Sequence, residues 1–399
     1  MPAGLTTTPE PSRSPLSLRR ALVFGCLLTV ALVALIRQSQ GLHASLLGWE
    51  DRLLRLTRAV LPEAAPSSLV VVTLDEATAR RVGPPPWPRD IYARFLAQLC
   101  RLQPRVVGLD LVFVGHDSQD TGDAALAQAM RACGNVLLTS HVDAFGRYVE
   151  PLPILASAAQ GYGVVNKPRG ADFVVRRGRA WMADAQGQLI DDAFEVKVAA
   201  AMLGVPLRQI QHAGRTVTLR GSRGAVTIQA LPDGTIPIRY AYQPSELPTL
   251  DFVDVLDGRV GSGAVRDKLV LVGWTYRDRD VHRTPLGMMS GLGIIANTTL
   301  MFLSGRSLIE LHDALELLLV FVLALLTIIL TYRLPAWQSG AAVAGVAAGC
   351  GATHLVLWRL GVLWHWSLPV GLMGLLYCST SLHRSVLLRR ETAAARRDE

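Results

Sequence analysis

Residues Leu69–Leu74 read LVVVTL, and this run carries the main evidence for the fold class. Its residues are apolar or β-branched and show no alternation with polar side chains, which predicts a strand that is buried on both faces. Two further strand-like runs occur downstream, GLDLVF from Gly108, which carries Asp110, and the doubly apolar LVLVGW at Leu269–Trp274. Strands buried on both faces need helices above and below them, so the sequence predicts an α/β sheet.

In the segments between these runs, the apolar residues have the spacing of the helices and strands that such a sheet requires. Residues 91–101 place Ile91, Phe95 and Leu99 on one side of a helix, and residues 105–114 continue as a strand. A second helix at 121–132 and a strand at 135–140 follow. This β-α-β-α-β order predicts neighbouring parallel strands with helices on their faces.

The middle of the chain has a different pattern, with short strand-like pieces separated by glycine, proline and aspartate turns. A helix at 193–203 interrupts them, and a further helix at 294–304 leads towards the next apolar region. The pieces predict an antiparallel section, so the whole fold is expected to be an α/β domain with a mixed sheet, flanking helices and an antiparallel part. They are residues 161–167, 179–182, 216–219, 225–230 and 236–240.

Apolar segments long enough to cross a bilayer flank this domain. Ala314–Tyr332 is the strongest, because it carries a single glutamate near its start. Residues 21–36 contain no charge; a signal peptide is the alternative there, but no A-x-A-like cleavage site follows. We expect four transmembrane helices, one N-terminal and three C-terminal, at residues 20–37, 313–333, 336–358 and 362–382.

The arginines near these segments predict the orientation, because basic residues close to membrane spans stay in the cytoplasm. Four crossings place residues 1–19, expected to be disordered, and the basic tail 383–399 in the cytoplasm. Residues 38–312 then lie beyond the inner (plasma) membrane of a bacterium, in the periplasm or outside the cell. The net charge of +8 partly reflects these flanks. Membrane lipid is therefore the expected partner, and nucleic acid is not.

Two cysteines, Cys100 and Cys133, fall in the predicted outer domain. Each ends a predicted helix just before a strand, so the two thiols are candidates for neighbours at one edge of the sheet. An oxidising compartment would allow them to pair as a disulfide. Two buried free thiols are the alternative.

Polar side chains at strand ends are the candidates for a ligand-binding site, because ligands of open α/β sheets gather at the carboxyl ends of strands. The proline-rich run PPPWPRD at 84–90 is a candidate recognition loop. Each feature also has a structural interpretation: Asp75 caps the next turn, Asp110 receives Arg89, and the run around Trp87 is a stiff lid. The six candidates are Asp75, Trp87, Arg89, Asp110, Asp280 and Thr284.

Signatures of catalysis are absent from the sequence. It contains no G-x-S-x-G elbow, no Walker loop, no H-E-x-x-H motif and no C-x-x-C pair. The histidines of the outer domain do not have the spacing of metal ligands. We therefore expect no catalytic residue, no metal and no cofactor, and we do not expect an enzyme.

Taken together, several segments resemble the type-2 CHASE domain, the extracytoplasmic sensor associated with bacterial cyclases and histidine kinases. The resemblance covers about residues 45–312 and rests on the order and spacing of its pieces. These are VVVTLDEAT from Val70, WPRDIYARFLAQL from Trp87, GLDLVF from Gly108, YGVVNK from Tyr162, ADFVVRR from Ala171, IPIRYA from Ile236, DKLVLVGWTYRDRDVHRTPLG from Asp267 and GLGIIAN from Gly291.

The resemblance implies signal reception outside the cytoplasm and transmission through the membrane helices. Because the stretch after Leu382 is too short for an output domain, we expect a stand-alone sensor or regulatory subunit. Its partner would be a separately encoded cyclase, kinase or other signalling protein. The small residues of the third span also suit helix association in a homodimer. The alternative is an envelope enzyme or assembly factor that uses the helices as a mount.

Overall fold

The computed structural model describes residues 15–64, 66–117, 121–275 and 280–398. The chain divides into two compact units. One is formed by Asp51–Ile309, and the other by the segments before and after it.

The core of the first unit is a seven-stranded sheet with the order β13-β1-β14-β2-β3-β4, in which β5 also pairs with β3. All of its pairs are parallel except β3–β4. The predicted strands at 69–74 and 269–274 are confirmed to the residue. The strands are β1 (Leu69–Leu74), β2 (Val106–Asp110), β3 (Val136–Val142), β4 (Tyr148–Val149), β5 (Gly161–Val164), β13 (Thr249–Asp251) and β14 (Leu269–Trp274).

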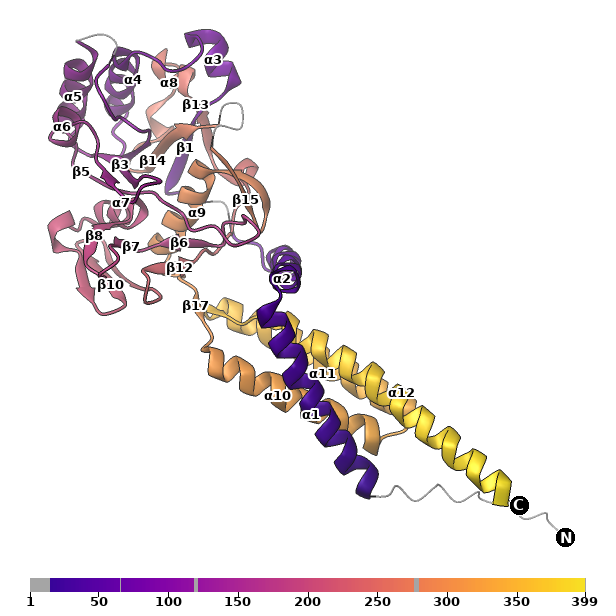
Figure 1. Cartoon of the computed structure of the whole chain (residues 1–399). Coiled ribbons are helices and arrows are strands. Elements are labelled where there is room, and N and C mark those ends of the chain that lie inside the picture. Colours follow the sequence, from indigo (N-terminus) through magenta and orange to yellow (C-terminus); the bar gives the residue numbers. More distant parts are fainter. Residues whose placement is uncertain (1–14, 65, 118–120, 276–279, 399) are drawn as a thin grey trace. The chain divides into compact units, whose positions relative to one another are not determined.

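Helices cover both faces of this sheet (Figure 1). Along β1, Val70 and Val72 pack with α4 (Arg89–Arg101), α5 (Gly122–Cys133) and α8 (Phe252–Leu256). The alternate residues Leu69 and Val71 pack with α7 (Phe194–Leu203) and α9 (Gly291–Leu303). This double burial explains why the strand carries no polar alternation. Two shorter helices, α3 (Glu76–Val82) and α6 (Pro153–Ala156), complete this part.

The predicted antiparallel section is present between α6 and α9. It consists of β9 (Gln211–Ala213), β10 (Thr216–Gly221) and β11 (Gly224–Gln229), and of the pairs β6 (Arg177–Arg179) with β12 (Thr235–Pro237), β7 (Trp181–Ala183) with β8 (Leu189–Asp192), and β15 (Val281–Thr284) with β16 (Gly287–Ser290). In the part of the chain that the structure describes, 3-10 helices at Leu207–Gln209, Pro244–Glu246 and Ser262–Ala264 lie in the connections.

The assignment of residues 161–167 to the antiparallel section is wrong. The segment Gly161–Val164 forms β5, which joins the main sheet parallel to β3. Gly163 lies so close to α7 that an added Cβ would come within 2.8 Å of the Phe194 Cα. The close contact with α7 requires glycine in this strand, and glycine interrupts the pattern of apolar side chains. The sequence of the strand therefore does not show to which sheet it belongs.

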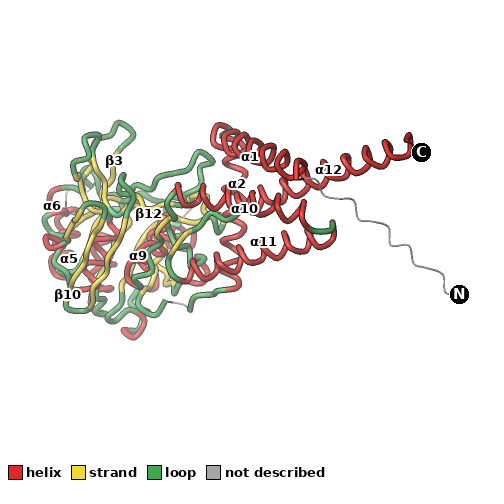
Figure 2. Tube along the Cα trace, turned by 90° about the horizontal axis from the view of Figure 1, so that it is seen from below, coloured by secondary structure: helices red, strands yellow, loops and turns green. Residues whose placement is uncertain are grey.

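The second unit consists mainly of long helices, α1 (Pro15–Gln38), α10 (Asp313–Arg333), α11 (Ala336–Arg359) and α12 (Ser367–Asp398). Within it, α10 packs against the other three, and the helices run alongside one another (Figure 2). The helix α2 (Gln40–Val60) spans the boundary between the units at Glu50, and the short strands β17 (Ile309–Glu310) and β18 (Val362–Leu363) flank the C-terminal helices.

Among the described residues, two helices, α10 and α11, are long and apolar enough to cross a membrane. The apolar part of α1, Leu22–Ile36, is shorter. The helix α12 begins at Ser367, so the first residues of the expected span 362–382 are not helical. Two of the four expected spans thus have suitable helices, and the crossings at the first and last positions stay predictions.

Candidate functional site

Asp75 caps the helix that follows it, which confirms the structural interpretation of this residue. It follows β1 and precedes α3, and its Oδ1 accepts a hydrogen bond of 2.9 Å from the backbone N–H of Thr78. The Thr78 hydroxyl donates to the same oxygen at 3.0 Å. This capping box satisfies donors in the first turn of the helix.

Trp87 is part of the hydrophobic core, with 6% of its surface exposed. Its indole N–H donates to the Gly83 carbonyl at 2.6 Å, and its ring packs against Tyr92, Phe252 and Trp274. The nearest ring centroid, that of Trp274, lies at 4.9 Å. This arrangement agrees with a stiff cover over the sheet.

Arg89 does not pair with Asp110, which corrects the expected ion pair. Its guanidinium binds Asp123 at the start of α5 and donates to the Gly115 carbonyl at 2.6 Å. Its backbone N–H donates to Asp117 at 2.8 Å. Because α4 and α5 pack side by side on one face of the sheet, the partner of Arg89 comes from the neighbouring helix and not from the strand.

Asp110 ends β2 and lies beside Gly273 of β14. Burial is the main cause that raises the pKa of Asp110 to about 7, and the negative charges of Asp280 and Glu195 add to it. Lys167 acts in the opposite direction. Lys167 is itself paired at 2.6 Å with Glu195, which is completely buried. This is a group of interacting charges at the carboxyl end of the sheet.

The remaining two candidates come from the hairpin of β15 and β16. Asp280 bonds His282 at 2.8 Å, and the buried Thr284 donates to the Gly287 carbonyl at 2.8 Å within the turn. Of the six candidates, Asp110 and Asp280 interact electrostatically, whereas Trp87 belongs to the hydrophobic core and Arg89 to the ion pair with Asp123. As a ligand-binding surface, the six residues stay a prediction.

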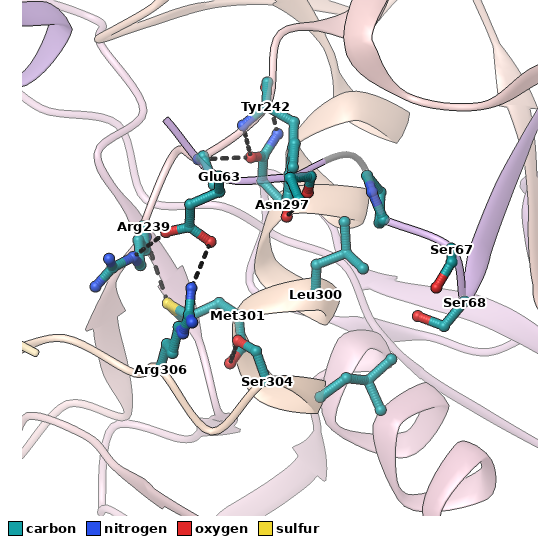
Figure 3. A pocket seen from close by; sticks show the side chains of 14 residues that line it. Glu63, Ser67, Ser68, Arg239, Tyr242, Asn297, Leu300, Met301, Ser304 and Arg306 are labelled. Atoms are coloured by element: carbon teal, nitrogen blue, oxygen red, sulfur yellow. Dashed lines mark hydrogen bonds and ion pairs between the residues drawn. The ribbon is translucent and has the colours of Figure 1, made fainter. Parts of the chain in front are cut away.

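A cavity of about 390 Å³ lies elsewhere in the outer domain, at the amino end of β1 (Figure 3). Ser67 and Ser68 immediately precede that strand, while Leu300, Met301 and Ser304 come from the end of α9. A third wall is formed by the segment after β12, which includes Arg239 and Tyr242. The volume is in the range of small-molecule sites.

Charge gathers at one end of this cavity. Glu63 accepts a hydrogen bond from the Arg239 Nε at 2.8 Å and another from the Arg306 Nη1 at 3.2 Å (Figure 3). Arg239 is buried, whereas the side chain of Arg306 is 57% exposed. The two serines lie across the cavity, with Leu300 between them and the charged end.

The wall behind the charged residues is held by hydrogen bonds. The Asn297 side chain accepts from the backbone N–H groups of Ala241 and Tyr242 at 3.0 and 2.9 Å, and it donates to the Tyr242 carbonyl at 2.9 Å. The Tyr242 hydroxyl donates to the Ala64 carbonyl at 3.0 Å. Burial, together with the charge of Glu63, raises the pKa of Tyr242, so this hydroxyl stays a donor.

Sequence reasoning missed this cavity. Its charged residues are far apart in the chain and none follows a parallel strand. The available signal was limited to two lining residues in segments that carry the family resemblance, Arg239 in IPIRYA and Asn297 in GLGIIAN.

The model of the CHASE2 domain family matches residues 28–330. This chain belongs to the CHASE2 domain family. CHASE2 domains are extracellular sensory domains of signalling proteins. Comparison with curated proteins and with solved structures gave no match.

Proposed function

We propose that this CHASE2 protein is a membrane-anchored sensor or regulatory subunit of bacterial signal transduction. In this proposal the outer domain receives an envelope signal, and the membrane helices pass it to a separate cyclase, kinase or other signalling protein. The observation that carries it is the extent of the family match, which begins within α1 and ends within α10. The matched region therefore includes the sensory fold together with parts of the helices that flank it.

An extracytoplasmic position of the outer domain is supported by its cysteines. Cys100 and Cys133 form a disulfide between the ends of α4 and α5, with their Cα atoms 5.6 Å apart. Disulfides persist in oxidising compartments and are rare in the bacterial cytosol. The arginines at the cytoplasmic side of a four-span topology support the same orientation.

A route for the signal is supported by the contacts of α2. Asp51 accepts two hydrogen bonds from Arg176 at 2.8 and 2.7 Å, and Arg176 also binds Asp172. Further along α2, Arg58 donates to the Ala241 carbonyl at 2.8 Å and pairs with Glu246. A change in these loops would therefore shift α2, which follows α1 directly. Transmission requires that the signal favours one such arrangement over another.

The experiment that tests the function is crosslinking in the native membrane. The full chain would carry a photoreactive residue at exposed Leu382 of α12, the last residue of the expected fourth span on its cytoplasmic side, and captured proteins would be identified by mass spectrometry. The matched control carries the same residue at exposed Phe145 of the outer domain. A cyclase or kinase captured from Leu382 and not from Phe145 supports the proposal.

Two outcomes would contradict a separate signalling partner. One is capture of envelope-building proteins, which would favour the assembly-factor alternative. The other is recovery of the chain crosslinked only to itself, which would point to a homodimer without a separate output.

A further inference from the structure

We propose that the cavity beside Glu63 binds a small monocarboxylate with a short apolar body, and that this ligand is the sensed signal. The inference rests on the proposed sensor function and adds the chemical class of the ligand. It places the site at the amino end of β1, away from the strand-end residues that the sequence indicates.

The charge balance of the cavity selects a monoanion. Arg239 and Arg306 carry two positive charges and Glu63 carries one negative charge, so the group has a net charge of about +1 near neutral pH. One carboxylate would neutralise it. Guanidinium groups also present paired donors that match the two oxygens of a carboxylate.

Access to this charge is provided by Arg306. Its side chain is 57% exposed and borders the cavity, whereas Arg239 is buried behind Glu63. A ligand carboxylate can therefore reach Arg306 without displacing the buried pair. The exposed arginine is the residue that we assign to ligand contact.

The rest of the lining sets the form of the ligand body. Leu300, Met301 and Leu303 of α9 present apolar surface next to the charged end. The hydroxyls of Ser67 and Ser68 lie on the far side (Figure 3). An acid with a chain of a few carbons would place its carboxylate at Arg306 and its apolar part along α9.

The position of the ion pair links ligand binding to the membrane helices. Glu63 lies between the end of α2 and the start of β1, and Arg306 lies between the end of α9 and the start of α10. The 3.2 Å bond between them therefore joins the two segments that lead out of the sensory fold. A ligand carboxylate that takes Arg306 competes with Glu63 and loosens this link, which is the differential effect that a signal needs.

The test is calorimetric titration of pentanoate into the full-length chain in lipid nanodiscs at pH 7, with empty nanodiscs as the blank. Pentanamide has the same shape without the charge, and glutarate has a similar length with two charges. We expect saturable binding of pentanoate and at least about tenfold weaker binding of the amide and of the diacid, because each loses the match to a net charge of +1.

Three variants locate the site. Arg306→Gln should weaken pentanoate binding at least about tenfold, because it removes the contacting charge. Arg94→Gln, which removes another exposed and ion-paired arginine outside the cavity, should leave it unchanged. Glu63→Gln keeps an acceptor for Arg239 but removes the competing charge, so it should tighten binding about threefold or more.

Several outcomes would overturn the inference. Absence of binding for the straight-chain acids from propanoate to octanoate would exclude this ligand class. Equal binding of pentanoate and pentanamide, or an unchanged affinity in Arg306→Gln, would exclude the assigned contact. Weaker binding in a folded Glu63→Gln variant would exclude the competition.

The titration needs no partner, so its result is independent of the crosslinking experiment. If no acid binds but a kinase or cyclase is captured, the ligand class is wrong and the proposed sensor function is still supported. If pentanoate binds but no partner is captured, the ligand class is supported and the separate signalling partner is contradicted.

Discussion

At the scale of residues, the described part of the outer domain holds two ion pairs in which both side chains are buried. Arg89 and Asp123 have side chains that are 8% and 9% exposed, and Lys167 and Glu195 are 9% and 0% exposed. Removing both ions from water has a large cost, and the pairing offsets it. Taking away one partner leaves a buried charge without compensation, so these pairs should be sensitive to single substitutions.

The substitution Asp123→Asn should destabilise the outer domain by about 3–5 kcal/mol, because Arg89 would stay buried without its counter-ion. Urea unfolding of the detergent-solubilised chain, followed by tryptophan fluorescence, measures the free energy of unfolding. The control is Asp90→Asn, which breaks the exposed pair with Arg94 and should cost less than about 1 kcal/mol. Similar losses in both variants would contradict the assignment of a buried pair.

Asp110 should make stability fall as the pH rises. Its pKa is raised from 3.8 to about 7, so the folded state keeps a proton that the unfolded chain releases above about pH 4. The free energy of unfolding should therefore decrease between about pH 4 and 7, by up to about 1.4 kcal/mol per pH unit from this group. Asp110→Asn should remove this contribution, seen as a difference between the two pH profiles. Parallel profiles over this range would show that Asp110 titrates normally.

At the scale of elements, the disulfide is a covalent link between two helices that already pack together. Cys100 is in the last turn of α4 and Cys133 in the last turn of α5, and both helices cover the same face of the sheet. The link therefore restricts the unfolded chain more than it changes the folded one.

Cys133→Ser should lower the free energy of unfolding by about 3–4 kcal/mol, as expected for closing a loop with a sequence separation of 33. Urea unfolding gives this value. A reductant should lower the wild type to the level of the variant and leave the variant unchanged. Cys26→Ser, at an exposed free cysteine, should have little effect. An effect of the reductant on Cys133→Ser would point to another redox-sensitive group.

At the scale of the whole molecule, the topology decides whether the outer domain can sense the envelope. Alkaline phosphatase is active only outside the cytoplasm, where its disulfides form. We expect activity for a fusion after Gly187, in the turn between β7 and β8, and none for a fusion after the C-terminal end of α12. Activity at both positions would mean that the chain crosses the membrane an even number of times after the outer domain. The four-span topology, which has three crossings there, would then be wrong.

The local sequence pattern was sufficient to predict the elements whose residues share one kind of environment. The strands β1 and β14 are each buried on both faces at all but one residue, so their apolar runs mark them to the residue. Asp75 could be recognised as a cap because a helix start depends on neighbouring residues alone. The glycine-containing β5 has no such local signal, since its place is decided by the approach of α7.

The α/β class, the antiparallel part, the apolar flanks and the resemblance to a sensory family follow from the amino-acid sequence alone, because each depends on composition or on order along the chain. The pairing of Arg89 with Asp123, and the meeting of Glu63 with Arg239 and Arg306 in one cavity, depend on how the chain packs in three dimensions. These contacts join residues far apart in the chain, and they form only when separate helices and strands pack around the same sheet.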